Sequence, residues 1–245
     1  MPYALAIFDL DGTLFRGEEP IPGAAEAVAR TRSRGSEVRF LTNNSSQTRD
    51  TYVAKLKRLG FEAHISEVYS SAIGTASYLR DEGLATAFVV GEPGLVHTLE
   101  EAGIRAVLDR PDAVVVGICR SFTYDLMNSA MQWIRFGSRF VATNPDPTYP
   151  MEGGRFIPGA GSIVAAVQTC SEVEPFVVGK PNPFLIDLIL REAKISPEKA
   201  LVVGDRMDTD IEAGRRAGCP TMLVLTGATS TAPDGQDWLP SVANL

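Results

Sequence analysis

Short, continuous runs of hydrophobic residues alternate along this chain with longer segments in which hydrophobic residues recur every three or four positions. The short runs are typical of strands buried on both faces, and we predict them at residues 5–8, 38–41, 200–203 and 222–225. The periodic segments predict helices at residues 23–34, 48–59 and 185–193, and a short helix from a Thr209 cap to Gly218. Strands that alternate with helices predict an α/β fold with a doubly wound parallel sheet.

The middle of the chain, at about residues 75–175, carries a set of strands and helices of its own. We predict strands at 88–91, 113–117 and 140–143, a helix at 123–136, and a loop rich in proline and glycine at 144–161. From Ala228 onward the chain is rich in Ser, Thr, Ala and Pro, which predicts a mostly irregular tail whose Trp238 and Leu239 pack back onto the protein.

The charge balance of the 245 residues is acidic, with 30 Asp and Glu against 23 Lys and Arg and a formal net charge of -7. This balance argues against general nucleic-acid binding, which needs a basic surface. The same charge repels an anionic substrate. A site for such a substrate therefore needs a bound cation or a local lysine.

The cysteine content and the hydropathy of the chain indicate the cellular compartment in which the protein works. The chain has three cysteines and no CxxC pair, which predicts reduced thiols: Cys119, Cys170 and Cys219. Its start lacks the basic segment and the long apolar core of a signal peptide. No stretch approaches the ~20 apolar residues of a membrane span. We therefore expect a cytoplasmic protein without a membrane partner.

Two carboxylates, Asp9 and Asp11, follow the first predicted strand. Residues i and i+2 of an extended chain point the same way, so both emerge at the carboxyl end of the strand, where open α/β sheets bind ligands. Adjacent carboxylates repel each other unless a cation lies between them. The alternative is an ordinary surface turn, since Asp-Gly is common turn chemistry.

Asp205 follows another buried strand, and Asp208 and Asp210 lie within the next turn. If both strands belong to one parallel sheet, Asp9 and Asp205 end at the same edge. Carboxylates there suit Mg²⁺, which keeps waters and phosphate oxygens as its other ligands. We interpret Asp208 as a helix-capping or dipole-compensating residue and Asp210 as a group that orients a ligand or a metal-bound water.

Two further polar segments follow predicted strands. The hydroxyl and backbone amides of Thr42–Ser45 form a natural phosphate cradle, unless this is a plain polar loop. Lys180 follows the apolar run 176–178 and can neutralise phosphate charge, unless it is a solvated surface lysine. Each signal is weak alone. Together the four strand ends predict a nucleophile, an acid–base group, a metal site and a phosphate clamp on one edge.

At these positions the sequence resembles the haloacid dehalogenase-like phosphohydrolases. Four motifs match in order: DLDGT at Asp9–Thr13, LTNNS at Leu41–Ser45, GKP at Gly179–Pro181 and GDRMDTDI at Gly204–Ile211. The last motif, together with TNPDPTYP at Thr143–Pro150 and PGAGSIVAAV at Pro158–Val167, is similar to the 4-nitrophenylphosphatase-type subfamily.

This resemblance implies a Mg²⁺-dependent phosphatase that acts on small-molecule phosphate monoesters. Asp9 would attack phosphorus and form an aspartyl phosphate, and Asp11 would protonate the leaving alcohol and then activate water. The implied metal ligands are the side chains of Asp9 and Asp205 and the carbonyl oxygen of Asp11, with Asp210 nearby. Residues that would hold the phosphate are Thr42, Asn43 and Lys180.

The resemblance also implies the domain organisation. Residues 1–74 and 176–245 would form the catalytic core, and residues 75–175 a smaller α/β cap that closes over the site and excludes water. In the cap, Asn144 and Asp146 would reach the leaving group, unless this segment is a connection that makes no contact. Dimers through the cap are common in similar proteins, so a homodimer is one option, and the oligomeric state stays open at this point.

Three alternatives remain open at this point. A phosphotransferase or mutase would use the same residues with a different phosphate acceptor. A receiver-like signalling module also holds phosphate on an aspartate, although its acidic pair is adjacent rather than spaced as Asp9 and Asp11 are. A non-catalytic binding protein can share the fold. The substrate itself is not encoded in any motif.

Overall fold

A computed structural model of the protein describes residues 3–150 and 156–245. The chain divides into two compact units. The larger unit runs up to Thr42 and also contains Arg49–Tyr69 and Lys180–Leu245, whereas the smaller unit consists of Asn43–Thr48 and Ser70–Gly179. The smaller unit is therefore an insertion in the larger one, as the predicted fold class requires. The functional division into a core (1–74 and 176–245) and a cap (75–175) stays a prediction.

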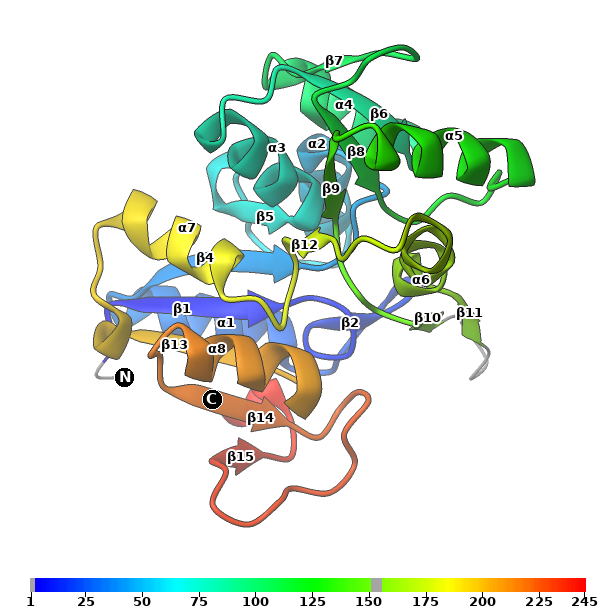
Figure 1. Cartoon of the computed structure of the whole chain (residues 1–245). Coiled ribbons are helices and arrows are strands. Elements are labelled where there is room, and N and C mark those ends of the chain that lie inside the picture. The colour runs from blue at the N-terminus through cyan, green and yellow to red at the C-terminus, as the bar shows by residue number, and fades with distance from the viewer. Residues whose placement is uncertain (1–2, 151–155) are drawn as a thin grey trace. The chain divides into compact units, whose positions relative to one another are not determined.

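Within the described residues, the larger unit contains a six-stranded sheet (Figure 1). Its strands, in spatial order, are β15 (Trp238–Leu239), β14 (Thr221–Val224), β13 (Ala200–Gly204), β1 (Leu5–Asp9), β4 (Glu37–Thr42) and β5 (Val68–Ser70). β1 pairs in parallel with β4 and β13, and β14 pairs in parallel with β13 and β15. β1 and β13 are buried along their whole length, as their continuous hydrophobic runs predict.

Helices cover both faces of this sheet, which confirms the doubly wound fold. They are α1 (Ala24–Ser33), α2 (Arg49–Arg58), α7 (Phe184–Ala193) and α8 (Glu212–Arg216). Ala6 and Phe8 of β1 share one core with Val28 of α1 and Leu56 of α2. α7 and α8 lie on the opposite face (Figure 1). Alternate residues of each strand thus feed different cores, because successive side chains of a strand point to opposite faces.

Strand register brings the carboxyl ends of the central strands level with one another. Asp9 lies opposite Leu41, so Thr42 follows at the same height. Phe8 lies opposite Val203, which places Asp205 two residues further along, at the same edge. The three polar positions predicted to share an edge therefore do so within the larger unit.

Within the described part of the smaller unit, a five-stranded sheet has the order β12 (Phe176–Val177), β9 (Arg139–Ala142), β8 (Ala113–Val116), β6 (Thr86–Val90) and β7 (Arg105–Ala106). Its pairings are parallel. Its helices are α3 (Ser71–Asp81), α4 (Pro93–Glu101), α5 (Tyr124–Arg135) and α6 (Ala160–Ser171). Hydrophobic residues of α5 and α6 pack on one face of the sheet, against Val114 and Val116 among others.

Two segments predicted to be irregular contain regular structure. The loop predicted at 144–161 contains an antiparallel pair, β10 (Thr148–Pro150) and β11 (Phe156–Pro158), and residues 151–155 of that loop lie outside the described residues. In the tail, Trp238 and Leu239 form β15 on the edge of the larger sheet. Leu239 packs back on the core as expected, whereas Trp238 is 48% exposed.

No helix in the described ranges 3–150 and 156–245 combines the length and the apolar character that a membrane span needs.

Candidate active site

A sharp turn follows Asp9, the last residue of β1, and this turn contains Asp11. Leu10, between them, is fully buried. Leu14 N–H donates to the Leu10 carbonyl at 2.8 Å, and Gly12 N–H donates to the carbonyl of Phe15 at 2.8 Å. Gly12 has a φ of 89°, a conformation that residues with a side chain rarely adopt. The positive φ explains why a glycine follows Asp11. The turn then leads the chain into the hairpin of β2 (Phe15–Arg16) and β3 (Glu19–Pro20).

Three buried carboxylates come together beside this turn: those of Asp9, Asp205 and Asp210. One oxygen from each lies within 4.8 Å of the others. Three oxygen donors this close fit a hard divalent cation, because Mg²⁺ prefers carboxylate oxygens and would relieve their mutual repulsion. The cluster thus fits the predicted cofactor through its donor chemistry.

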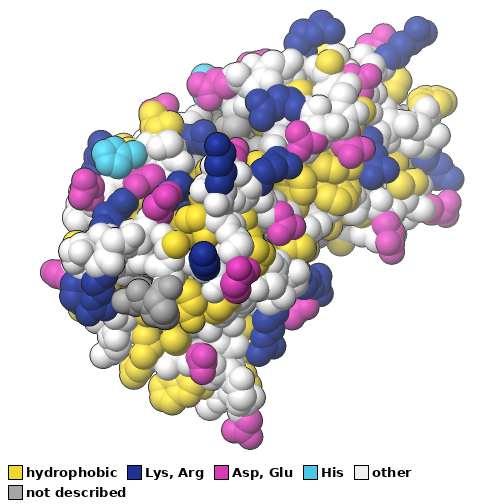
Figure 2. Space-filling view, turned by 90° about the vertical axis from the view of Figure 1, so that its left-hand side faces the viewer, with side chains coloured by type: hydrophobic (Ala, Val, Ile, Leu, Met, Phe, Trp, Pro, Cys, Tyr) yellow, Lys and Arg dark blue, Asp and Glu magenta, His cyan; other side chains and the backbone are white. Residues whose placement is uncertain are grey.

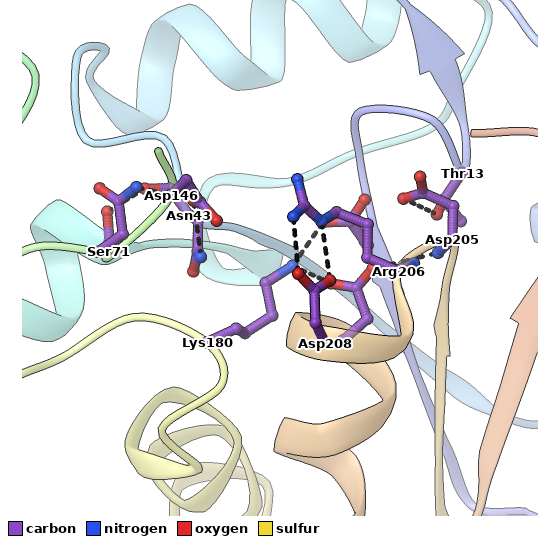
Figure 3. Close-up of polar contacts among 11 residues, drawn as sticks. Thr13, Asn43, Ser71, Asp146, Lys180, Asp205, Arg206 and Asp208 are labelled. Atoms are coloured by element: carbon purple, nitrogen blue, oxygen red, sulfur yellow. Dashed lines mark hydrogen bonds and ion pairs between the residues drawn. The ribbon is translucent and has the colours of Figure 1, made fainter. Parts of the chain in front are cut away.

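Lys180 lies inside this cluster. Its Nζ is 2.5 Å from Asp9 Oδ1 and 2.6 Å from Asp210 Oδ1, and the residue is only 2% exposed. Figure 3 shows its side chain extended toward the acidic groups. The alternative of a solvated surface lysine is therefore wrong.

The strand before Lys180 departs from our expectation. We placed the run 176–178 at the same sheet edge as Asp9, but β12 pairs with β9 in the sheet of the smaller unit. Lys180 is thus the first residue of the larger unit after the insertion, and it reaches Asp9 from a connection rather than from a strand end of that sheet.

Burial and charge act on this cluster together. Burial, and then the charge of Asp210, raises the pKa of Asp9, while Lys180 opposes the shift. The same two causes raise the pKa of Asp205 to about 7. Burial alone would lower the pKa of Lys180, but Asp210 and Asp9 outweigh it and hold this pKa above its usual value. The cluster therefore contains one protonated lysine among carboxylates that still favour a further positive charge.

Asp210 uses both of its carboxylate oxygens. Oδ2 accepts from the backbone N–H groups of Asp205 at 3.1 Å and Arg206 at 3.0 Å, and Oδ1 accepts from Lys180. A side chain at Gly204 would collide with Asp210, so the glycine allows this close approach. Asp210 thereby orients Lys180 and the backbone after β13. Its predicted role toward a ligand or a metal-bound water stays a prediction.

The helix that carries Asp210 begins earlier than predicted. A one-turn π-helix spans Met207–Ile211 and continues into α8. Thr209 is buried inside this turn and does not cap it. The early start follows from Asp210, whose bonds to the two preceding backbone N–H groups satisfy donors at the beginning of the turn.

Asp208 lies apart from the carboxylate cluster. Its side chain is 71% exposed and accepts from Arg206 Nε at 3.2 Å and Nη2 at 2.9 Å (Figure 3). This bond lowers the pKa of Asp208. Asp208 lies in the first turn of the helix, where a negative charge compensates the helix dipole.

Asp11 differs from the other acids. Its carboxylate is not part of the three-carboxylate cluster, and burial raises its pKa while the charge of Lys55 opposes the shift. A carboxyl group that keeps its proton at higher pH is suited to donate it to a leaving group.

The remaining predicted residues lie in two places. Thr42 is 3% exposed and ends β4 in the larger unit. Asn43, Asn144 and Asp146 belong to the smaller unit, where the amides of Asn43 and Asn144 donate to Asp146 Oδ2 at 2.9 and 2.7 Å. The structure thus brings these last three together.

Sequence reasoning missed the loop that follows β14. Ala228 N–H donates to Asp205 Oδ2 at 2.5 Å, and the Thr226 hydroxyl donates to the Gly12 carbonyl at 2.7 Å. The signal that identified the other segments, a polar residue directly after a buried strand, was present at Thr226 as well.

Comparison with known proteins decides the family. A model described as haloacid dehalogenase-like hydrolase matches residues 6–105, and a HAD-hydrolase-like model matches residues 177–241. Ribonucleotide monophosphatase NagD of Escherichia coli K12 is 38% identical over 245 residues, which cover 98% of this chain and 96% of that protein. The chain belongs to the haloacid dehalogenase-like hydrolases. The matches include both Asp9 and the segment of Lys180 and Asp205.

Solved structures within this family agree. NagD from Escherichia coli K-12 has a TM-score of 0.91 at 36% identity, covering 100% of this chain and 99% of that one. The p-nitrophenyl phosphatase of Archaeoglobus fulgidus has a TM-score of 0.91 at 32% identity, covering 98% and 97%. A glycerol phosphate phosphatase of Mycobacterium tuberculosis, solved in complex with magnesium, has a TM-score of 0.89 at 36% identity, covering 98% and 76%. The predicted subfamily is confirmed.

Proposed function

We propose that this protein hydrolyses small phosphate monoesters through a phosphorylated aspartate, with Asp9 as the nucleophile. Like its relatives in the family, it is a phosphoric monoester hydrolase that uses Mg²⁺. One observation carries the assignment of the nucleophile. The Asp9 carboxylate ends β1 at the sheet edge, 2.5 Å from the buried Lys180 and within a cluster of metal-binding geometry.

Asp9 and Asp11 divide the chemistry. An Asp9 oxygen forms a bond to phosphorus as the ester P–O bond breaks, and Asp11 gives its proton to the departing oxygen. The resulting Asp11 carboxylate then takes a proton from water, whose oxygen attacks phosphorus and breaks the Asp9–phosphorus bond. The raised pKa of Asp11 supports the first of these proton transfers.

Several residues bind and orient the transferring group. When bound, Mg²⁺ supplies positive charge that offsets the carboxylates and the phosphate. It would be held by the side chains of Asp9 and Asp205 and the carbonyl oxygen of Asp11, with Asp210 in direct or water-mediated contact. Residues assigned to the phosphate are Thr42, Asn43 and Lys180. Because the net charge of the chain is -7, local positive charge is essential for binding this anion.

The smaller unit acts as the cap, and within it Asn144 and Asp146 are assigned to the substrate. Their support is the shared hydrogen-bond network with Asn43, which directly follows Thr42. The relatives act on ribonucleotides, 4-nitrophenyl phosphate and glycerol phosphate by their names, and a substrate of this size class is proposed for this chain.

The test is a screen of the purified protein for phosphate release. Glycerol phosphates, nucleoside monophosphates, sugar phosphates and 4-nitrophenyl phosphate are assayed with Mg²⁺ and with chelator. We expect release that needs Mg²⁺ and is lost in Asp9→Asn, with Asp208→Asn as the control from outside the cluster. Full turnover by Asp9→Asn would overturn the proposal. Phosphate recovered on a second alcohol instead of in solution would identify a phosphotransferase or mutase.

Location and assembly are part of the same proposal. All three cysteines carry free thiols, which supports a cytoplasmic location. The face of the molecule in Figure 2 mixes Lys and Arg with Asp and Glu side chains, unlike the basic surface of a nucleic-acid-binding protein. A homodimer through the cap is proposed from the family resemblance, and light scattering in solution tests it.

A further inference from the structure

The loop after β14 contacts two of the elements that carry the proposed metal ligands. Gly204, at the end of β13, lies opposite Leu223 of β14, so the chain leaves both strands at the same edge. Within five residues of its end, β14 is followed by Thr226–Thr229, which we call the anchor loop. All of these residues belong to the larger unit.

The anchor loop fixes the side chain and the backbone of Asp205. Ala228 N–H donates to Asp205 Oδ2 at 2.5 Å, and Thr229 N–H donates to the Asp205 carbonyl at 3.1 Å. A Cβ at Gly227 would collide with the carboxylate, and a Cβ at Gly12 would lie 2.6 Å from Asp205 Oδ2. The carboxylate is therefore confined between two glycines, with one oxygen held by a backbone donor.

Thr226 ties the anchor loop to the turn that contains Asp11. Its hydroxyl donates to the Gly12 carbonyl at 2.7 Å. Its own carbonyl accepts from Arg16 Nε at 2.8 Å and from Arg16 Nη2. One residue thus connects the β1 turn, the β2 strand and the loop that holds Asp205.

We propose that Thr226 is a positioning residue of the Mg²⁺ site, which sets the place of the Asp205 carboxylate relative to the Asp9–Gly12 turn. This inference rests on the proposed function, since it assumes that the carboxylate cluster binds Mg²⁺. Groups that orient metal ligands typically contribute about 10–100-fold to metal affinity or activity. Thr226 touches neither the metal nor the substrate in this assignment, and it acts through Gly12 and Ala228.

The direct test is isothermal titration of the full-length, substrate-free protein with Mg²⁺. Thr226→Val keeps the branched shape and removes the hydroxyl, and we expect it to weaken Mg²⁺ binding by about 10-fold. Thr226→Ser keeps the hydroxyl, and we expect its Mg²⁺ affinity to stay within about twofold of that of the parent protein. A purely steric role would not require the serine variant to keep this affinity. At saturating Mg²⁺, the phosphatase activity of Thr226→Val should recover toward that of the parent.

A second variant covers the case in which Thr226→Val does not fold. Arg16 is exposed, so Arg16→Gln removes its bonds to Thr226 with little cost to the core, and we expect weaker Mg²⁺ binding. The matched control is Arg34→Gln. Arg34 is another exposed arginine that donates to a backbone carbonyl, that of Leu245 at 3.2 Å, but it lies before β4, at the amino edge of the sheet.

The outcomes separate this inference from the proposed function. If Asp205→Asn loses Mg²⁺ binding while Thr226→Val and Arg16→Gln bind like the parent, Thr226 is no positioning residue and the inference is wrong. The same holds if thermal unfolding in chelator shows Thr226→Val to be less stable but its Mg²⁺ affinity is unchanged. If Asp205→Asn itself binds Mg²⁺ as tightly as the parent, the proposed metal site fails, and this inference fails with it.

Discussion

Lys180 Nζ lies 2.5 Å from Asp9 Oδ1, and both side chains are almost completely buried. The lysine also contacts Asp210 at 2.6 Å, so one cation serves two carboxylates. In a buried site these contacts keep Lys180 protonated. They also hold the Asp9 carboxylate in place before a phosphate binds. The proposed nucleophile and the cation proposed to hold the phosphate are thus preorganised together.

Lys180→Met is expected to lower both activity and stability. Removing one partner of a buried ion pair leaves an uncompensated charge, which typically costs about 3–5 kcal/mol of unfolding free energy. Loss of a charge-stabilising donor typically costs about 10²–10³-fold in kcat. Denaturant unfolding and steady-state kinetics measure the two effects. Lys57→Met, which removes an exposed lysine from α2, is the control and should change neither.

Stability and catalysis are separated by adding Mg²⁺ to the Lys180→Met protein. A bound divalent cation offsets the charges of Asp9 and Asp210, so we expect Mg²⁺ to restore part of the lost stability. We do not expect it to restore kcat. A variant with normal kcat at saturating Mg²⁺ would show that Lys180 only stabilises the fold.

Asp11→Asn is expected to slow hydrolysis most for substrates with poor leaving groups. An alkyl phosphate needs a proton on its departing oxygen, whereas 4-nitrophenolate leaves readily without one. General acid–base catalysis typically contributes about 10²–10⁴-fold, and we expect the larger loss with an alkyl phosphate such as glycerol phosphate. Equal losses with both substrates would argue against Asp11 as the acid.

The second half of the reaction gives an independent measure of Asp11. In the proposed mechanism Asp11 also activates water, so its removal should slow hydrolysis of the phosphorylated Asp9. Rapid mixing with 4-nitrophenyl phosphate should then give a burst of 4-nitrophenolate close to one equivalent per site, followed by slow turnover. Asp208→Asn, with its exposed side chain outside the cluster, is expected to show the parent kinetics.

The sequence was sufficient to predict which residues meet at the edge of the larger sheet, because local signals and topology agree there. Continuous hydrophobic runs mark β1 and β13 as buried strands, and parallel pairing brings Asp9 and Asp205 to one edge without further information. The partner of β12 was not predictable in this way. A strand of two residues carries no signal that distinguishes one sheet from the other, and its pairing with β9 depends on contacts between distant segments.

Helix α3 shows a second limit of pattern reasoning. Its buried residues include Ser71, Thr75 and Ser77, and Gly74 lies among them. Small polar side chains can be buried when they hydrogen-bond to the backbone, as Thr75 does to the Ser71 carbonyl at 2.7 Å. Because these small polar residues lie among the buried apolar positions Ala72, Ala76 and Leu79, the contrast between hydrophobic and polar faces is weak and hydropathy periodicity did not reveal the helix.

Mg²⁺ affinity is expected to rise with pH around neutrality. Burial raises the pKa of Asp9, and it raises that of Asp205 to about 7, so the metal-free protein holds protons that Mg²⁺ must displace. Titration calorimetry in buffers of different ionisation enthalpy counts these protons. We expect proton release on binding near pH 7, and less at a pH well above the Asp205 value. Binding without proton release would mean that the carboxylates are already ionised.

The same shifts predict the stability of the metal-free protein. A carboxyl group whose folded pKa lies above its unfolded value stabilises the fold while protonated. This contribution is lost as the pH rises through the folded pKa, near 7 for Asp205. Unfolding in chelator should therefore become easier through this range, and Asp205→Asn, which cannot ionise, should remove part of the dependence.

Asp146 and Asn43 are expected to be energetically coupled. Asp146 Oδ2 accepts from the Asn43 amide at 2.9 Å and from the buried Asn144 amide at 2.7 Å. Asp146→Ala leaves both amides without this acceptor, which typically costs about 1–3 kcal/mol of unfolding free energy for a buried group. If Asn43 holds the phosphate, the misplaced amide should also raise KM more than it lowers kcat.

A double-mutant cycle of Asn43→Ala and Asp146→Ala measures this coupling. Residues in one hydrogen-bond network typically interact by about 0.5–3 kcal/mol, so the effects on kcat/KM should be clearly less than additive. Asp125→Ala, an exposed acid in α5, is the matched control and should combine additively with Asn43→Ala. Additivity in the Asp146 cycle would mean that Asp146 acts on the substrate directly and does not position Asn43, because two independent contacts contribute separately.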